Sequence, residues 1–515
     1  YYMKKKLKLF KRFIYSRVVF CFLLLAMQIC MYLFFIIKFS PYFFYFAGVN
    51  LILSFTFMAY LSNCEGKNEF KIAWLLPTMI FPLFGISLYI YTKMATRNAR
   101  LKNKIEQSKI QTWKFVPKPT ETKSAFPEIS DLAFYLYESG NFPVYTDSDV
   151  EYFSCGEDFF PDFMQELKNA KEFIFLEFFI ITPDDSWQKI LEILKKKVSE
   201  GVEVRVLYDG IGSVLASTKV YHKYLASLGI KSKIYMPLTP VFNLQQNNRD
   251  HRKIAVIDGK ISYTGGLNLA NEYFNFGQNK FSYWKDSAVK IRGNATKTYT
   301  ALFLQMWNLA KFPEKKFNKS YEKFFPAIKE NSKEGLLIPY ADNAYNEKDI
   351  AENICLYILS KATRNVCITT PYIIIDNQLK SALIFAASRG INVSLIVPSK
   401  PDHFLTFCIG KTFLKTLVEN GVHVYLYLPG FIHSKLFTSD GKIATVGSIN
   451  IDYRSLFHHF EDGLLIYKKS VIEKIQRDIE LTKLSCKEMT LDDYKKLPLI
   501  VKMLGRIFRI FAPLV

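Results

Sequence analysis

Residues 248–259 read Asn-Arg-Asp-His-Arg-Lys-Ile-Ala-Val-Ile-Asp-Gly, and Gly265-Gly266-Leu267-Asn268 follows shortly after. A second stretch, residues 433–441, reads His-Ser-Lys-Leu-Phe-Thr-Ser-Asp-Gly and is followed by Gly447-Ser448-Ile449-Asn450. Five positions of the two copies match at one constant offset of 182 residues: His251 and His433, Lys253 and Lys435, Asp258 and Asp440, Gly265 and Gly447, and Asn268 and Asn450. A repeat of this period predicts two related lobes, with the chemistry between them.

Apolar runs alternate with helical patterns before each motif. Strands are expected at 173–181 and 202–208 with a helix at 187–200 between them, and strands at 366–371 and 393–397 with a helix at 378–389 between them. This alternation predicts an α/β fold in which two homologous lobes have mixed sheets flanked by helices. The expected boundaries are a basic linker at 93–130, lobe 1 at 131–310 (motif 248–275), an inter-lobe linker at 311–345 and lobe 2 at 346–490 (motif 428–455).

The composition indicates a membrane portion. Of the 515 residues, 50% are hydrophobic and 16% aromatic, which is rich for a soluble protein. Three apolar runs, 18–38, 41–61 and 72–92, carry no charge except Lys38 at the end of the first, and each has about the 20 residues that span a bilayer. They predict transmembrane helices, although the first run could instead form a hairpin within one leaflet. The net charge of +21 favours an anionic partner, either nucleic acid or an acidic lipid surface.

The basic segments on either side of these runs give conflicting predictions of their orientation in the membrane. The positive-inside tendency places both the basic N-terminus (1–17) and the basic stretch from Lys93 to Lys104 in the cytoplasm, which three crossings do not allow. We favour a multi-pass protein of the cell membrane with a cytoplasmic catalytic portion. Residues 495–515 form a basic amphipathic helical pattern, which suits either an anionic bilayer surface or packing on the catalytic domain.

The repeated residues suit phosphoryl chemistry. Side chains two apart on a strand share a face, so His251 lies beside Lys253 and His433 beside Lys435. Two ammonium groups and the amides of Asn268 and Asn450 can hold one phosphate diester. One imidazole can then attack phosphorus to give a phosphohistidine while the other acts as acid and base, which requires one neutral and one protonated imidazole.

Small residues after each motif, Gly265-Gly266 and Gly447-Ser448, are expected to allow a ligand to approach the backbone closely. The carboxylates and the eight scattered cysteines show no metal-ligand spacing, so the sequence predicts neither a metal nor another cofactor.

The paired motif resembles that of the phospholipase D superfamily, and from about residue 41 to 515 the chain is similar to the bacterial cardiolipin synthases. Further support lies in residues 72–77, 201–213, 449–455 and 513–515. Two features depart from that family: an extra apolar run precedes the usual two-span anchor, and the glycine that usually closes the last span is absent near Tyr91. Both concern the membrane topology and leave the motif intact.

The resemblance implies roles for individual residues. His251 becomes the nucleophile and His433 the acid and base, with the reverse assignment open. Lys253, Lys435, Asn268 and Asn450 bind phosphate, and Asp286 and Glu461, downstream of the motifs, are the carboxylates that orient the histidines. Asp258 and Asp440 belong to the motif but are expected to support their Asp-Gly turns.

The resemblance also implies an activity. A phosphatidyl group would pass from one phosphatidylglycerol to another, giving cardiolipin and glycerol, with the bilayer as partner and no nucleic acid. The alternatives are a hydrolase of phospholipid or nucleic acid, transfer to another alcohol, or a non-catalytic lipid-binding scaffold. The oligomeric state is left open.

Overall fold

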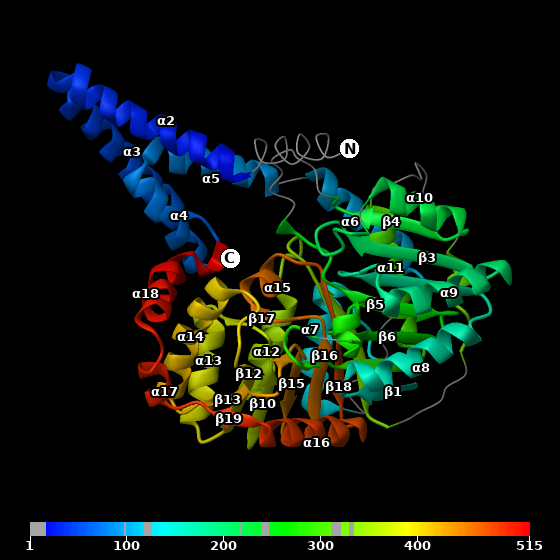
Figure 1. Cartoon of the computed structure of the whole chain (residues 1–515). Helices are drawn as coiled ribbons and strands as arrows, with labels where there is room; N and C mark the ends of the chain where they lie inside the picture. Colours follow the sequence, from blue (N-terminus) through cyan, green and yellow to red (C-terminus); the bar gives the residue numbers. More distant parts are fainter. Residues whose placement is uncertain are drawn as a thin grey trace. The chain divides into compact units, whose positions relative to one another are not determined.

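The computed structural model describes residues 17–96, 99–117, 126–216, 218–237, 247–277, 279–310, 321–328 and 334–514 (Figure 1). The chain forms two compact units. One comprises residues 1–100, 238–247 and 508–515, and the other comprises residues 101–237 and 248–507. The basic N-terminus expected at 1–17 lies outside the described residues except for Arg17. Both repeated motifs belong to the second unit.

In the described part of the second unit, the first sheet has seven strands and the second has eight. The order in the first is β1 (Ser148–Phe153), β8 (Ala288–Gly293), β6 (Ile261–Gly265), β5 (Lys253–Ile257), β2 (Phe173–Phe178), β3 (Glu203–Asp209) and β4 (Lys231–Tyr235). The order in the second is β9 (Leu336–Asp342), β18 (Glu461–Tyr467), β16 (Ile443–Gly447), β15 (Leu436–Ser439), β10 (Asn365–Thr369), β12 (Asn392–Pro398), β13 (His423–Tyr427) and β19 (Cys486–Glu488).

The two orders correspond strand for strand, with β19 as the one addition among the described strands. In each sheet three strands run parallel and the hairpin that carries the motif runs antiparallel to them. The prediction of two homologous lobes with mixed sheets is therefore confirmed. The strands form because their residues are largely apolar and buried on both faces: all six residues of β2 are buried, and all but Glu177 are apolar.

Helices flank both sheets (Figure 1). Asp184 and Asp376 play the same part in the two lobes, because each side chain accepts a hydrogen bond from the backbone at the start of the helix that follows the first parallel strand. The helices are α6 (Ala99–Trp113), α7 (Ser130–Gly140), α8 (Gly156–Asn169), α9 (Asp185–Ser199), α10 (Lys219–Ser227), α11 (Thr296–Leu309), α12 (Ile350–Lys361), α13 (Asn377–Ser388), α14 (Phe404–Glu419), α15 (Tyr453–Phe457), α16 (Val471–Leu484), α17 (Leu491–Lys495) and α18 (Leu499–Phe508).

Two expected linkers contain regular structure. The linker expected at 311–345 is wrong in its last part, because residues 336–342 form β9, the edge strand of the second sheet. Pro339 is tolerated there because an edge strand needs hydrogen bonds on one side alone. The linker expected at 93–130 contains α6, where no proline interrupts the helix.

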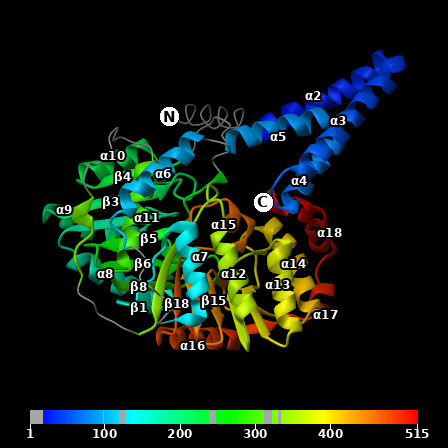
Figure 2. The ribbon, with the colours of Figure 1, turned by 180° about the vertical axis from the view of Figure 1, so that it is seen from behind.

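The boundary of lobe 1 also differs from the expected one at its start. Helix α7 lies beside α12 of the second lobe (Figure 2), and Asn353 Nδ2 donates to Tyr135 Oη at 2.7 Å.

The first unit contains the apolar N-terminal helices α2 (Arg17–Lys38), α3 (Phe43–Asn63), α4 (Asn68–Ile80) and α5 (Pro82–Thr96). The single helix expected at 72–92 is two helices that meet at Phe81, whose φ of −133° and ψ of 77° are not helical. Pro82 disfavours a helical conformation at the preceding residue and has no N–H to donate to the Thr78 carbonyl. Ser54 Oγ of α3 donates to that carbonyl instead, and Gln28 Oε1 of α2 accepts from Phe84 N.

Among the described residues, one helical segment, Ser40–Asn63, is both long and apolar enough to cross a membrane, and Leu25–Lys38 is a shorter apolar stretch.

The C-terminal segment expected as one helix at 495–515 is α18 followed by a 3-10 helix, Arg509–Leu514. Helix α18 packs through Val501 and Gly505, where a Cβ atom at Gly505 would lie 2.3 Å from the Cys408 carbonyl oxygen of α14. Its other side exposes Leu499, Met503 and Ile507. Helix α18 therefore packs on α14 with one side and exposes an apolar stripe on the other.

The motif aspartates Asp258 and Asp440 lie outside the catalytic centre, each at the end of its strand remote from the histidine. The Asp258 carboxylate accepts hydrogen bonds from the backbone N–H groups of residues 171–173 at 2.7–2.9 Å. The Asp440 carboxylate does the same with residues 363–365 at 2.8–2.9 Å. Burial raises the pKa of Asp440, but these backbone hydrogen bonds outweigh it and the net pKa is lowered. Both aspartates therefore make the backbone contacts that the expected structural role requires.

We expect Asp440→Asn to lower the free energy of unfolding by about 1–2 kcal/mol, because an amide N–H₂ then faces backbone donors that the carboxylate now accepts from. Asparagine tolerates the positive φ of 54° at this position, so backbone strain does not add to the effect. Thermal unfolding in detergent measures the change, and specific activity of the folded fraction is expected to stay within about threefold. A large loss of activity in fully folded variant would contradict a structural role.

Candidate active site

The backbone before β5 is held by the second lobe. His251 N donates to the Phe460 carbonyl at 2.9 Å, and Phe460 N donates to the Arg249 carbonyl at 2.8 Å. These bonds attach the residues that enter β5 to the residues that enter β18. His251 therefore cannot take its place until both lobes have folded and met.

The backbone before β15 is held by the first lobe in the same way. Strand β14 (Phe431–Ile432) pairs in parallel with β7 (Trp284–Lys285), and His433 N donates to the Lys285 carbonyl at 2.7 Å. In both cases the accepting carbonyl belongs to the residue just before a carboxylate: Phe460 precedes Glu461, and Lys285 precedes Asp286.

The two carboxylates are exchanged between the lobes. Glu461 of lobe 2 lies 2.9 and 3.0 Å from His251 Nδ1 of lobe 1, and Asp286 of lobe 1 lies 2.5 Å from His433 Nδ1 of lobe 2. A carboxylate that accepts from Nδ1–H fixes the tautomer and leaves the lone pair of Nε2 available. The structure thus pairs both predicted carboxylates with histidines, each across the lobe interface.

The small residues after each motif make room for these carboxylates. A Cβ atom at Gly266 would lie 1.9 Å from Asp286 Oδ1, and at the equivalent position Ser448 Oγ donates to Glu461 Oε2 at 2.5 Å. Beside them, a Cβ atom at Gly447 would lie 2.3 Å from the Asp462 carbonyl oxygen. The expectation that a ligand approaches the backbone here is wrong, since strands β8 and β18 and their carboxylates occupy that side.

The lysines and Asn268 lie at the same centre, and the buried Asn450 follows β16 as Asn268 follows β6. Lys435 Nζ is 2.7 Å from His433 Nδ1 and 3.8 Å from Asp286 Oδ2, and Lys253 Nζ donates to the His251 carbonyl. Asn268 Oδ1 accepts from Ile180 N at 3.0 Å, which turns its amide nitrogen away from that strand. Among the described residues, this nitrogen has no hydrogen-bond partner although it is buried, so it is available to a phosphate oxygen.

Burial sets the protonation of the histidines. It lowers the pKa of His251 to about 3 despite the nearby Glu461 charge, and burial together with the Lys435 ammonium lowers the pKa of His433 to about 4. The expectation of one neutral and one protonated histidine is therefore wrong for the protein without substrate, where both imidazoles are neutral at pH 7. An anionic diester between the two lysines would oppose the lysine charges and raise both values.

Aromatic rings exclude water from both histidines. Phe179 lies 5.0 Å from the His251 ring, and Trp284 and Tyr273 lie 5.2 and 5.8 Å from the His433 ring, measured between ring centroids. These contacts join residues far apart in sequence, so the spacing of the motif could not reveal them.

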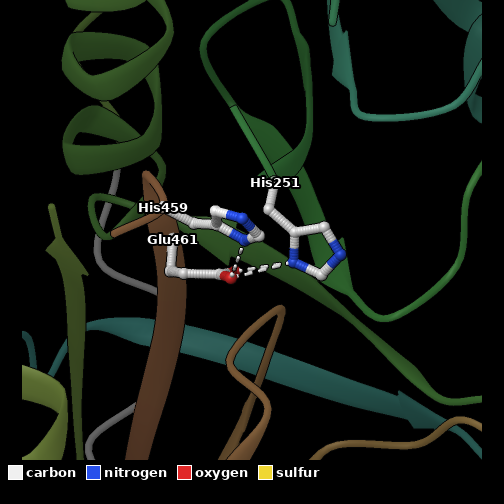
Figure 3. A group of neighbouring side chains, drawn as sticks. All are labelled: His251, His459 and Glu461. Atoms are coloured by element: carbon white, nitrogen blue, oxygen red, sulfur yellow. Dashed lines mark hydrogen bonds and ion pairs between the residues drawn. The ribbon is translucent and has the colours of Figure 1, made fainter. Parts of the chain in front are cut away.

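His459, which belongs to neither repeated motif, is a further residue of the centre. Its Nδ1 lies 3.5 Å from Glu461 Oε1, so two imidazoles face one carboxylate (Figure 3). The spacing contained a signal, because residues two apart at the start of a strand point to the same side. The nitrogen and oxygen atoms of His251, His459 and Glu461 lie within 4.8 Å of one another, as a metal site would require, and Glu461 hydrogen-bonds to His251 while it contacts His459 at ion-pair distance.

Buried ionisable side chains also lie near the centre, and no sequence motif indicates them. Arg252 Nε is 2.9 Å from Glu177 Oε1, and Asp250 lies within 3.5 Å of the same guanidinium. Asp462 of lobe 2 is buried nearby, where burial raises its pKa to about 7. These groups lie where the two lobes meet, and an unpaired charge there would be strongly destabilising.

The family described as "Cardiolipin synthase, PLD-like domain" matches residues 163–307 and 356–482, which together make up more than half of the chain and carry both motifs. The chain belongs to this family. The two matched segments coincide with the two lobes, and each contains one of the two motif histidines and one of the exchanged carboxylates.

Relatives cover nearly the whole chain. It is 39% identical to an uncharacterized protein of Streptococcus mutans over 88% of this chain and 98% of that protein. It is 30% identical to cardiolipin synthase 1 of Staphylococcus aureus over 90% of this chain and 95% of that protein. Among solved structures, a phosphatidylserine synthase of Haemophilus influenzae has the same fold, with a TM-score of 0.55 and 16% identity over 71% of this chain and 95% of that one.

The pKa values of the two lysines predict how kcat/KM depends on pH. Burial lowers the pKa of Lys435 to about 7 and that of Lys253 to about 8, so both ammonium groups lose their protons as the pH rises above these values. The histidines stay neutral down to about pH 4. We expect kcat/KM for phosphatidylglycerol to fall about tenfold per unit above about pH 7, where Lys435 loses its proton, and by a further factor of about ten per unit above about pH 8, where Lys253 also loses its proton.

The Lys435→Arg variant is the control, because a guanidinium stays protonated throughout this range and should move the fall in kcat/KM to higher pH. The measurement uses vesicles of constant composition from pH 5 to 9. A wild-type profile that stays level to pH 9 would refute the assignment of the basic limb to the lysines.

Proposed function

We propose that this phosphatidyltransferase moves a phosphatidyl group from one phosphatidylglycerol to a second, forming cardiolipin and glycerol through a phosphohistidine. The observation that carries the proposal is the pair of exchanged histidine–carboxylate contacts around two lysines and two asparagines. Membership of a family named for cardiolipin synthase supports the lipid substrate.

The first half of the reaction forms the covalent intermediate. Nε2 of His251 attacks phosphorus, and the bond from phosphorus to the glycerol oxygen breaks. His433, protonated once the anionic diester is bound, gives its proton to that oxygen, so glycerol leaves neutral. Lys253, Lys435 and Asn268 stabilise the charge on the other phosphate oxygens.

The second half reverses these steps with a new alcohol. A hydroxyl of the second phosphatidylglycerol gives its proton to His433 and attacks phosphorus, the bond from phosphorus to Nε2 breaks, and cardiolipin leaves. One phosphodiester is exchanged for another, so no energy source is needed. Assigning His251 as nucleophile extends the resemblance in the motif, and the two pairs are similar enough in geometry that the reverse order is the competing form.

The product test uses the purified full chain with phosphatidylglycerol as the sole lipid, with no added metal and with a chelator present. We expect cardiolipin and glycerol in equal amounts, and His251→Ala or His433→Ala to lower the rate by at least about 10³-fold while the protein still folds. Phosphatidic acid in place of cardiolipin would make the enzyme a hydrolase. Near-normal turnover by either variant would exclude the two-histidine mechanism.

The membrane arrangement that fits these residues is a two-helix hairpin. Helices α2 and α3 have 22 and 21 residues, whereas α4 and α5 have 13 and 15, fewer than the about 20 that a crossing requires. Two crossings return the chain to its starting side, so the basic residues of 4–17 and those from Lys93 to Lys104 can both be cytoplasmic. The break at Phe81 thereby removes the conflict in the sequence, and the catalytic unit follows on the cytoplasmic side.

Labelling of single cysteines tests this arrangement in a variant that lacks the natural cysteines. A maleimide that does not cross membranes should label Phe39→Cys, in the turn between α2 and α3, in intact cells. It should label Glu65→Cys, between α3 and α4, after permeabilisation alone. The opposite pattern would place the catalytic unit outside, and labelling of both in intact cells would show that α3 does not cross.

A further inference from the structure

Lys411 is a buried cation that the mechanism above does not use. It lies in α14 with 5% of its surface exposed, and its Nζ is 4.8 Å from the centroid of the Phe407 ring. Among the described residues, none places a carboxylate within ion-pair distance of this nitrogen; Asp493 acts on it from further away and is itself paired with Lys487 at 2.5 Å. A buried ammonium without a counter-ion is unfavourable, which points to a charge that arrives with a ligand.

Lys411 lines a pocket of about 390 Å³, a volume that includes open solvent at its mouth. The wall is largely apolar and includes Ile373, Val397, Phe407, Leu414 and Phe431. Asp402 is the one acidic residue among the described lining residues, and it accepts a hydrogen bond from Tyr372. Lys400, at the exposed edge, adds a second positive charge. One buried cation in an apolar wall suits a phosphate that carries apolar groups.

The pocket is next to the catalytic centre. Phe431 belongs to its wall and also lies 6.2 Å from the His433 ring and 5.0 Å from the Trp284 ring. Tyr273 packs on His433. Burial raises the pKa of Tyr273, and the negative charge of Asp402, which lines the same pocket, contributes to this rise. A molecule that occupies the pocket is therefore separated from the proposed general base by little more than one aromatic ring.

The proposed reaction needs a second phosphate site at this place. Both substrates are anionic diesters, and the lysines and asparagines of the motifs hold the phosphate that reacts. The acceptor brings another phosphate, which three carbon atoms separate from the reacting one in the product. Without a cation of its own, that phosphate would face the first across a water-poor space, where like charges repel strongly.

The surroundings favour a lipid over a free ion. Helix α14 exposes Phe404 at its start, and α18, which packs on α14 at Gly505, exposes Leu499, Met503 and Ile507. Arg506 is exposed on the same helix. An exposed apolar stripe with basic residues beside it is typical of a helix at an anionic lipid surface.

We propose that Lys411 binds the phosphate of the acceptor phospholipid and so directs the phosphatidyl-enzyme towards a lipid alcohol. This assignment rests on the proposed transfer function and names the site for its second substrate.

A partition experiment tests the assignment. The full chain acts on phosphatidylglycerol vesicles in the presence of a fixed concentration of ethanol, and the ratio of cardiolipin to phosphatidylethanol is measured by mass spectrometry. Both products come from one intermediate, so their ratio does not depend on the amount of active enzyme. We expect Lys411→Met to lower this ratio by about tenfold or more, because ethanol brings no phosphate. Lys411→Arg should keep the ratio within about threefold of wild type.

Lys415→Met is the matched control. Lys415 lies one turn further along α14, pairs with Glu419 at 2.6 Å and does not line the pocket, so its variant should leave the ratio unchanged. Replacing a buried unpaired charge with methionine should not lower the melting temperature, which is measured in parallel. An unchanged ratio in Lys411→Met, or an equal fall in both products, would overturn the assignment.

Two further results separate this proposal from its neighbours. If inorganic phosphate inhibits the wild type but not Lys411→Met while the ratio of the two products is the same in both, the pocket binds free phosphate and the lipid assignment is overturned. If the wild type forms phosphatidylethanol or phosphatidic acid but no cardiolipin, the proposed function fails before any variant is compared.

Discussion

The catalytic centre depends on the exchange of carboxylates between the lobes. His251 takes its tautomer from Glu461 and His433 takes its tautomer from Asp286, and each contact is reinforced by a backbone hydrogen bond from the histidine to the residue before the carboxylate. Neither lobe holds a complete pair on its own. The order of the strands, the glycines that let β8 and β18 come close, and the buried ions around Arg252 all serve to bring these two edges together.

Burial gives the centre its chemical character. Aromatic rings and the lobe interface remove water, so the imidazoles are neutral and the lysines are only weakly held in their charged form. A phosphate diester is the ligand that such a site lacks, because its single negative charge offsets the two ammonium groups. Binding and activation are then one event: the anion that restores the lysine charges also raises the basicity of the imidazoles. The site is poised for its substrate by electrostatics.

The sequence predicted the repeat, the two lobes and the alternation of strands with helices, because these follow from local spacing, and the structure brings the motif histidines and lysines to one centre. It also located Asp286 and Glu461, but the exchange between lobes is a property of the assembled interface and has no local signature. Two elements were predicted as linkers for local reasons. Strand β9 carries a proline and follows a polar stretch. Helix α6 is rich in charged residues and has no clear apolar face from which a helix could be predicted. The break at Phe81 was readable from Pro82, yet the uniform hydropathy of residues 72–92 concealed it. Lys411 was missed because the burial of a single side chain is decided by distant residues, whereas His459 was missed although its position two residues before Glu461 was a local signal.

The exchange of carboxylates determines when the protein can become active during its synthesis. A nascent chain emerges from the ribosome with His251 long before residue 461 has been made, so the first lobe can fold on or near a membrane without the carboxylate that orients His251. Activity begins when β18 is added and the two halves close, late in synthesis. An enzyme that breaks phosphodiester bonds in the very lipid that surrounds it is thus silent until its last lobe is in place.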